Sequence, residues 1–242
     1  MSDPLAALLD LPGVSDAVAA ARAAVAEVHR HQTNRRGWPA TAAEASVRAA
    51  RASAALDGGP TDIPEEGRVA DPVLAGALRA AEALGPLLPT WERAPLQALA
   101  RLHVLAAADL AERDDLGRPR PGSGQRLELL ADLVTGGTKV PGPVVTAVVH
   151  GELLALRPFG AAGGVVARAA ARLAMIATGL DVKGLGVPEV FYLRRATRYR
   201  ELADGFATGD PERLAEWIVF ACEGLTDGAR EAASIADAAV TA

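Results

Sequence analysis

The sequence predicts an all-α fold, and three observations support this prediction. Half of its 242 residues are hydrophobic, and alanine, the strongest helix former, dominates them, whereas aromatic residues make up only 4%. Two pairs, Asp71-Pro72 and Asp210-Pro211, each place a capping side chain before a proline that suits the first turn of a helix. Evidence for strands is nearly absent.

Start and stop signals set the helix boundaries in order along the chain. Ser15 marks the first start, Thr41 and Glu44 form a capping box at the second, and the two Asp-Pro pairs mark later starts. Stops are expected at Gly37, at 58–59 and at Gly179. Gly, Pro and charged residues accumulate in two expected loops, 57–72 and 114–125. Helices are therefore expected at 14–32, 41–56, 71–84, 94–113, 126–134, 142–156, 164–179, 189–207 and 211–238.

Composition restricts the compartment and the partners. The net charge of -5 disfavours binding to nucleic acid or to an anionic membrane, because both prefer a basic surface. Cys222 is the only cysteine, which excludes an intramolecular disulfide and a cysteine-based metal cluster and fits a reducing compartment. No stretch reaches the roughly 18 uncharged apolar residues of a membrane span. A soluble cytoplasmic protein is expected.

The stretch "LRPFGAAGGVVARAAARL", residues 156–173, is typical of an anion-binding turn. Gly163 and Gly164 come directly before a helix, and the free N–H groups at a helix start point toward an approaching anion. Arg168 follows one turn inside the helix, where a guanidinium can contact phosphate or carboxylate with two hydrogen bonds. The alternative is an ordinary turn, because Gly-Gly often precedes a helix without any ligand.

Residues 157–168, "RPFGAAGGVVAR", resemble the motif HPFxDGNGRxxR of the Fic family. Fic proteins are helical adenylyltransferases that move AMP from ATP to a hydroxyl side chain. Pro158, Phe159, Gly164 and Arg168 match the motif.

The remaining specified motif positions differ. Arg157 stands in place of the catalytic histidine, Ala161 in place of the acidic metal ligand, Gly163 in place of the anion-hole asparagine and Val165 in place of the first phosphate-binding arginine. An arginine stays protonated and cannot act as a general base, and alanine offers no oxygen to magnesium. The resemblance therefore implies a site that has lost the transfer reaction; ATP, AMP or phosphate remain candidate ligands, and magnesium is not expected.

The resemblance continues on both sides of the motif. "VVHGELLALRPF" resembles the helix that leads into the family's active site, with His150 at the customary spacing, and residues 199–229 resemble the family's C-terminal region. In all, the resemblance covers about residues 40–230. It implies a Fic-type (Fido) helical bundle with an N-terminal helical region at 1–90 and a Fic-like core at 91–242.

The segment "SVRAARASAALDGG", within an expected inhibitory helix at 41–58, resembles the self-inhibitory helix of the family. Ser53, Asp57 and Gly58 occupy the matching places, and the resemblance implies that Asp57 pairs with Arg168. Asp is one methylene shorter than the family's Glu, so this contact needs a closer helix or a bridging water. The alternative is that Arg168, with Arg157 and the glycine amides, binds an external anion.

Three functions are compatible with these residues. The favoured one is a pseudoenzyme with a Fic-type fold that binds a nucleotide or another anion in a regulatory or interaction role. The second is an active AMP transferase with altered chemistry, in which a displaced histidine, His150, or a group of the substrate supplies the base. The third is a structural helical module or dimerisation protein. Candidate partners are a protein target, a second copy of the chain, and a nucleotide or phosphate.

Other polar residues have structural interpretations. His29 and His31 are expected to cap a helix end rather than bind metal, and His103 and His150 are expected in the core. The loop 114–125 corresponds to the family's β-hairpin flap and is expected to be flexible, without strands. A solvated helix face, rather than a nucleic-acid patch, is expected at Arg194, Arg195, Arg198 and Arg200.

Overall fold

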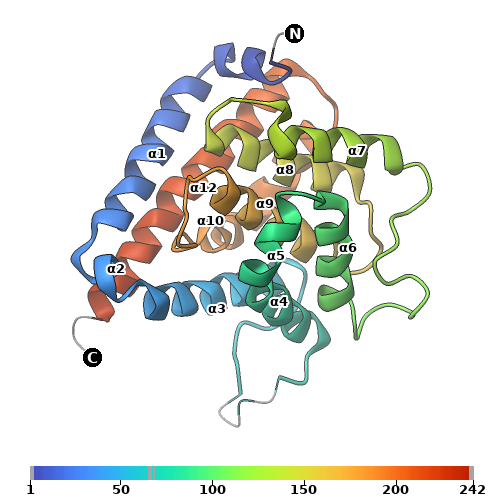
Figure 1. The fold of residues 1–242 in the computed structure, drawn as a ribbon, viewed down its shortest axis with the longest axis horizontal. Coiled ribbons are helices and arrows are strands. Elements are labelled where there is room, and N and C mark those ends of the chain that lie inside the picture. The colour runs from blue at the N-terminus through green and yellow to red at the C-terminus, as the bar shows by residue number, and fades with distance from the viewer. Residues whose placement is uncertain (1–2, 65–66, 68, 240–242) are drawn as a thin grey trace.

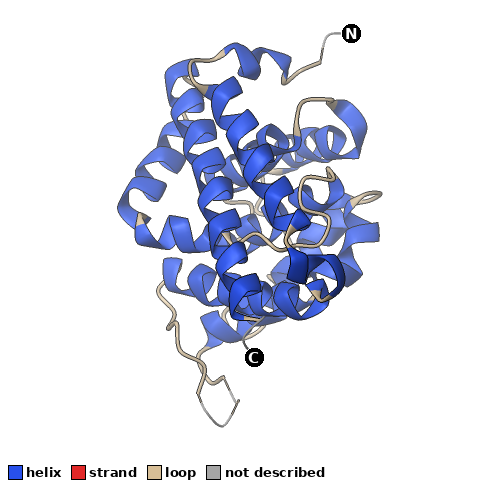
Figure 2. Ribbon diagram, turned by 90° about the vertical axis from the view of Figure 1, so that its left-hand side faces the viewer, coloured by secondary structure: helices blue, strands red, loops and turns tan. Residues whose placement is uncertain are grey.

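The computed structural model describes residues 3–64, 67 and 69–239, and all regular elements of this part are helices (Figures 1 and 2). No strand occurs among these residues, which confirms the all-α prediction. Residues 65, 66 and 68 of the expected loop 57–72 lie outside the described part. The elements are η1 (Ala6–Asp10), α1 (Val14–Arg30), α2 (Gln32–Arg36), α3 (Trp38–Leu56), α4 (Pro72–Glu82), α5 (Leu84–Trp91), α6 (Pro95–Ala106), α7 (Gly124–Asp132), an irregular turn η2 (Leu133–Gly137), α8 (Gly142–Leu156), α9 (Gly163–Ala177), α10 (Pro188–Arg194), α11 (Ala196–Phe206) and α12 (Pro211–Ala238).

Helix α8 lies at the centre of the fold because its sequence is apolar on nearly every side. One side, with Val149 and Leu153, packs into a cluster that includes residues of α4, α5, α6 and α9. The opposite side, with Val144 and Ala147, packs into an aromatic cluster shared with α1, α10, α11 and α12. The C-terminal end of α8 is therefore fixed from two sides, and the candidate motif follows directly after it.

The N-terminal helices pack against the C-terminal helix. Helices α1 and α12 lie side by side at the left of Figure 1 and run in the same direction. Helix α3 crosses below them and contacts α4, α9, α10 and α12. This crossing brings the end of α3 to the start of α9. The division into regions 1–90 and 91–242 stays a prediction.

Several expected boundaries are confirmed. Helix 142–156 is found as predicted, and 211–238 likewise. Both Asp-Pro caps form: Asp71 accepts a hydrogen bond from the Leu74 N–H, and Asp210 accepts from the N–H groups of Glu212 and Arg213. Short acceptor side chains satisfy the free donors of these helix starts.

Two start signals are wrong. Ser15 lies inside α1, after the cap residue Gly13, and its hydroxyl donates to the Leu9 carbonyl. Thr41 lies inside α3, which begins at Trp38, so the expected capping box does not form. The Thr41 hydroxyl donates instead to the Asn34 side chain, a tertiary contact that no local pattern encodes. The first helix also ends at Arg30, and α2 follows as a separate element.

Three other helices differ from expectation. The helix expected at 94–113 already ends at Ala106. The one expected at 189–207 is divided by Arg195 into α10 and α11. Helix α5 is absent from the predicted helices and forms although Pro89 lies in its interior, where proline is unfavourable. Burial of Leu87 and Trp91 in the core compensates for this low propensity.

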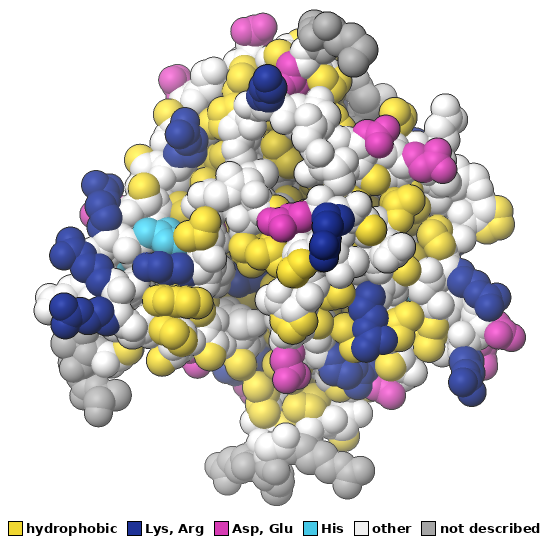
Figure 3. Space-filling view, in the orientation of Figure 1, with side chains coloured by type: hydrophobic (Ala, Val, Ile, Leu, Met, Phe, Trp, Pro, Cys, Tyr) yellow, Lys and Arg dark blue, Asp and Glu magenta, His cyan; other side chains and the backbone are white. Residues whose placement is uncertain are grey.

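Charged side chains are unevenly distributed over the face shown in Figure 3. Lys and Arg gather around α2 at the left edge, whereas both signs mix over the rest of this face. The last turn of α1 carries Arg30 and the last turn of α2 carries Arg35 and Arg36. Cations at these positions face the negative ends of two helix dipoles, so a local cause accounts for this gathering.

Candidate anion-binding site at the start of helix α9

The turn between α8 and α9 is held in an unusual backbone conformation. Arg157 (φ 45°) and Ala162 (φ 55°) both lie in the left-handed region, which costs a residue with a side chain about 1 kcal/mol or more. Phe159 between them is buried and stacks on His103, with ring centroids 4.4 Å apart. This anchor offsets the backbone strain and fixes where α9 begins.

Arg168 of α9 is 2% exposed, and residues of α3 and α11 surround its guanidinium. Its Nε donates to Ser53 Oγ at 2.8 Å, and its Nη2 donates to the Ser53 carbonyl at 2.9 Å. Its Nη2 also lies 2.9 Å from Asp57 Oδ1. Burial acts to lower the pKa of Arg168, but the Tyr199 oxygen and the Asp57 carboxylate outweigh it and raise the pKa, so this side chain stays charged.

The Asp57 carboxylate rests on the first turn of α9. Its Oδ2 accepts a hydrogen bond of 3.1 Å from the Val165 N–H while Oδ1 faces Arg168. A Cβ on Gly164 would lie 2.5 Å from one carboxylate oxygen, so only glycine leaves room for this contact. A negatively charged group of the chain itself therefore occupies the position at which a helix start attracts an anion.

A cavity of about 440 Å³ opens beside this contact. Arg157 lies at its exposed edge and faces Asp204 at 3.3 Å, with both side chains 71% exposed. Arg200 of α11 donates from Nη2 to the Leu56 carbonyl at the end of α3. The cavity is lined by Leu56, Asp57, Arg120, Leu153, Leu154, Arg157, Phe159, Gly160, Gly163, Gly164, Arg168, Tyr199, Arg200, Ala203 and Asp204.

His150 lies below the site rather than in it. The side chain is fully buried, and its Nε2 is 2.8 Å from the hydroxyl of Tyr199, which in turn contacts Arg168. Burial, and then the charge of Arg168, lower the pKa of His150 to about 3. The imidazole is therefore neutral at pH 7 and does not line the cavity.

The cavity lining offers cations rather than acid–base groups. Its only carboxylates are Asp57 and Asp204, and each faces an arginine. In the part of the chain that the structure describes, no group of three or more His, Cys, Asp or Glu side chains is arranged to hold a metal ion. Within the same part, no helix is both long and apolar enough to cross a bilayer.

The structure brings together the residues that the sequence singled out. Arg157, Gly163, Gly164 and Arg168 all line the cavity, and Asp57 joins them from α3. The Asp57–Arg168 contact is direct, so neither a longer side chain nor a bridging water is needed.

Sequence reasoning missed two lining arginines. Arg120 belongs to a loop that carries no periodic signal, and its backbone N–H donates to the Pro158 carbonyl at 2.7 Å. Arg200 belongs to the run that was expected on a solvated face, yet it borders the cavity. A helix interrupted at Arg195 changes the direction of the following residues, and no sequence signal predicted that interruption.

The structure places all four histidines of the chain. His103 and His150 are buried, as predicted. His29 and His31 lie at a helix end as expected, but their rings do not cap it: they face carboxylates of other segments, Asp181 at 2.8 Å and Asp237 at 3.1 Å. Tertiary packing supplies these partners, which is why local capping was the wrong interpretation.

Comparison with known proteins identifies the fold. No protein-family model matches the chain, and no curated protein matches it. Among solved structures, it is similar to a crystal structure of a Fic family protein from Desulfovibrio desulfuricans G20, with 20% identity and a TM-score of 0.66 over 90% of this chain and 74% of the other. This likeness confirms the resemblance at the level of the fold: the chain has a Fic-type (Fido) fold.

Proposed function

We propose that this chain is a Fic-type pseudoenzyme that has lost adenylyl transfer and binds an anion, such as the phosphate of ATP or AMP, in competition with Asp57. One observation carries the proposal. The Asp57 carboxylate already occupies the first turn of α9, between the Val165 N–H and Arg168. A phosphate would use the same donors and the same cation.

The residues at the motif positions argue against transfer. Arg157 stands where the family resemblance expects the base, and a guanidinium holds its proton at any physiological pH. Loss of a positioned base costs about 10²–10⁴ in rate. Ala161 provides no oxygen for magnesium, and His150 is buried against Tyr199 with a pKa of about 3. Transfer would therefore lack both proton removal by a base and charge neutralisation by a metal ion.

The exposure of Asp57 supports exchange with an external ligand. Its side chain is 25% exposed and borders the cavity, whereas Arg168 is almost fully buried. An acceptor at the end of a helix can turn away while the buried cation stays in place. Such exchange would let a nucleotide or phosphate alter the end of α3, and through it the binding of a protein target or a second copy of the chain.

Calorimetric titration with ATP, AMP and phosphate, with and without magnesium, tests this function. The proteins to compare are the wild type, Asp57→Ala and Arg168→Met. Asp57→Ala should bind at least about tenfold more tightly than the wild type, because about 1.4 kcal/mol of internal competition is removed. Arg168→Met should not bind, and its melting curve must show that it is folded.

Two outcomes would contradict the proposal. If folded wild type and folded Asp57→Ala both fail to bind ATP, AMP and phosphate, the chain is better explained as a structural helical module. Incorporation of label from ATP into protein by the wild type, lost in His150→Gln, would support an active transferase instead.

A further inference from the structure

Three arginines at the mouth of the cavity have no strong internal partner. These outer arginines, Arg120, Arg157 and Arg200, are exposed, in contrast to the buried Arg168. Within the described residues, no hydrogen bond or ion pair of the Arg120 guanidinium is found, and Arg200 binds only the Leu56 carbonyl. Arg157 faces Asp204 in a solvent-exposed pair, a type of contact worth about 0–1 kcal/mol. The mouth therefore carries surplus positive charge.

Separate segments bring the outer arginines to one opening. Arg120 comes from the loop between α6 and α7, Arg157 from the end of α8, and Arg200 from α11. The backbone bond from Arg120 to Pro158 fixes the loop against the turn. The Arg120 guanidinium lies beside this turn, because a Cβ built on Gly160 would be 3.7 Å from Arg120 Nη2, an ordinary van der Waals contact. The three side chains thus line one cavity although no sequence motif contains all three.

Part of the cavity wall is apolar. Leu153, Leu154 and Phe159 line the same cavity as Arg168 and the outer arginines. A guanidinium suits bidentate contact with a phosphoryl group and is only weakly hydrated, so exposed guanidiniums with weak partners in a partly apolar cavity favour an anion of this type. The Asp57 carboxylate occupies the Val165 N–H and Arg168, and no hydrogen bond or ion pair joins it to the outer arginines among the described residues.

We infer that the outer arginines form a second anion subsite, so that the ligand of this cavity carries two linked phosphoryl groups. One group takes the place of Asp57 on the Val165 N–H and Arg168, and the other binds the outer arginines. The two-group ligand rests on the proposed function, whereas the outer subsite by itself does not. Both a nucleoside diphosphate and a diphosphate without a base have this chemistry.

Arg200 connects the outer subsite to Asp57. Its Nη2 donates to the carbonyl of Leu56, the residue immediately before Asp57. A phosphoryl group that draws Arg200 away leaves this helix-end carbonyl without that donor. Occupation of the outer subsite therefore removes a hydrogen bond between α11 and the end of α3. Its loss favours release of Asp57 from the Val165 N–H and Arg168.

Calorimetry with phosphate, pyrophosphate and ADP tests the subsite at constant ionic strength. The Arg120→Gln and Arg200→Gln variants are made in the wild type and in Asp57→Ala. Arg118→Gln, two residues away on the same loop and exposed but not lining the cavity, is the matched control. These substitutions replace exposed side chains, and unchanged melting temperatures would establish that the proteins are folded.

In Asp57→Ala, pyrophosphate should bind at least tenfold more tightly than phosphate. Arg120→Gln or Arg200→Gln should remove most of this advantage, and Arg118→Gln should change it less than twofold. ADP binding more tightly than pyrophosphate would identify the nucleotide as the source, and equal binding would identify the diphosphate alone. Either result agrees with the inference.

These measurements distinguish failure of the outer subsite from failure of the proposed competition with Asp57. Equal effects of Arg118→Gln and Arg120→Gln would overturn the subsite, as would an Asp57→Ala protein that binds phosphate and pyrophosphate equally. If Asp57→Ala changes nothing but pyrophosphate binding still depends on Arg120 and Arg200, the outer subsite stands and the proposed competition with Asp57 is wrong. Absence of binding in every protein would overturn both.

Discussion

The two ends of helix α9 each meet a carboxylate from another part of the chain, and the two carboxylates differ in accessibility. At the start, Asp57 accepts one backbone N–H and faces Arg168. After the end, Asp181 accepts two backbone N–H groups and faces His29. The chemistry is similar at both ends, but Asp57 is 25% exposed beside a cavity and Asp181 is 1% exposed.

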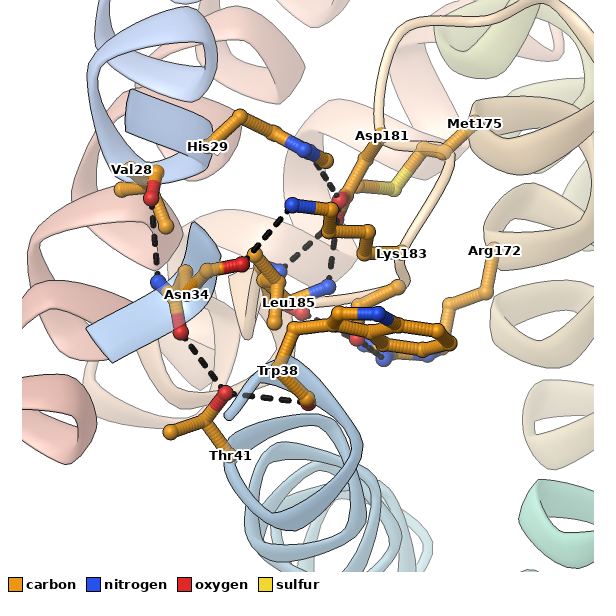
Figure 4. Close-up of polar contacts among 12 residues, drawn as sticks. Val28, His29, Asn34, Trp38, Thr41, Arg172, Met175, Asp181, Lys183 and Leu185 are labelled. Carbon is orange, nitrogen blue, oxygen red and sulfur yellow. Dashed lines mark hydrogen bonds and ion pairs between the residues drawn. The ribbon is translucent and has the colours of Figure 1, made fainter. Parts of the chain in front are cut away.

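Asp181 belongs to a closed polar cluster (Figure 4). Its carboxylate points toward His29 of α1 and binds the N–H groups of Leu185 and Gly186, at 3.1 and 2.7 Å. Nearby, Lys183 donates to the Asn34 carbonyl in α2. Burial acts to raise the pKa of Asp181, but the hydrogen bonds from His29 and the two amides outweigh it and lower the pKa. This cluster joins α1 and α2 to the chain after α9.

Under the proposed function, the accessibility of the carboxylate separates a structural contact from an exchangeable one. Asp181 cannot leave without uncovering two buried amides, whereas Asp57 can turn into a solvated cavity. The same distinction applies to the neighbouring cations: Arg172 pairs with the buried Glu189, and Arg168 pairs with the accessible Asp57. We therefore expect ligand binding at Arg168, because a ligand can replace its accessible partner Asp57.

The largest effect on the free energy of unfolding is expected at Asp181, after the C-terminal end of α9. Asp181→Ala should lower the free energy of unfolding by about 3–5 kcal/mol, because it leaves buried donors without an acceptor. Urea unfolding would measure this loss. Asp237→Ala is the matched control, since Asp237 also pairs with a histidine but is 74% exposed, and it should cost at most about 1 kcal/mol. Similar losses in the two variants would contradict the comparison.

A smaller loss of unfolding free energy is expected when acid protonates His150, which contacts Tyr199 beneath Arg168. The pKa of His150 falls from 6.5 to about 3 on folding, so the unfolded chain binds a proton more readily between these values and acid destabilises the fold. His150 should contribute a loss of about 2 kcal/mol between pH 6.5 and 4.5. Urea unfolding of wild type and His150→Gln at both pH values isolates this contribution from that of the carboxylates. An equal loss in the two proteins would show that His150 does not titrate in this way.

The smallest effect is expected at Asp57 itself. Asp57→Ala should cost about 1 kcal/mol, because cavity water can solvate the Val165 N–H and Ser53 still binds Arg168. Thermal and urea unfolding of this variant beside Asp181→Ala provide the measurement. A loss as large as that of Asp181→Ala would make Asp57 a structural residue and remove the basis for exchange.

Much of the fold and part of the site could be predicted from local signals. Alanine content and the Asp-Pro caps predict helices because propensity and capping act within a few residues. The glycines before α9 and the arginine inside it lie within one segment, so their proximity follows from helix geometry. Asp57 was found through a resemblance rather than through its own surroundings.

By itself, the sequence determined an all-α chain and the helical motif segment, and its resemblance to the Fic motif implied that Arg157 and Ala161 stand at the positions of the base and the metal ligand. Only the tertiary structure decided that Asp57 contacts α9 directly, that Arg120 and Arg200 border the cavity, and that Asp181 closes the other end. These contacts join residues far apart in the chain, and Arg120 and Asp57 lie at or beyond helix ends. Packing of α3, α9 and α11 around α8 sets such distances, and no local periodicity encodes that packing.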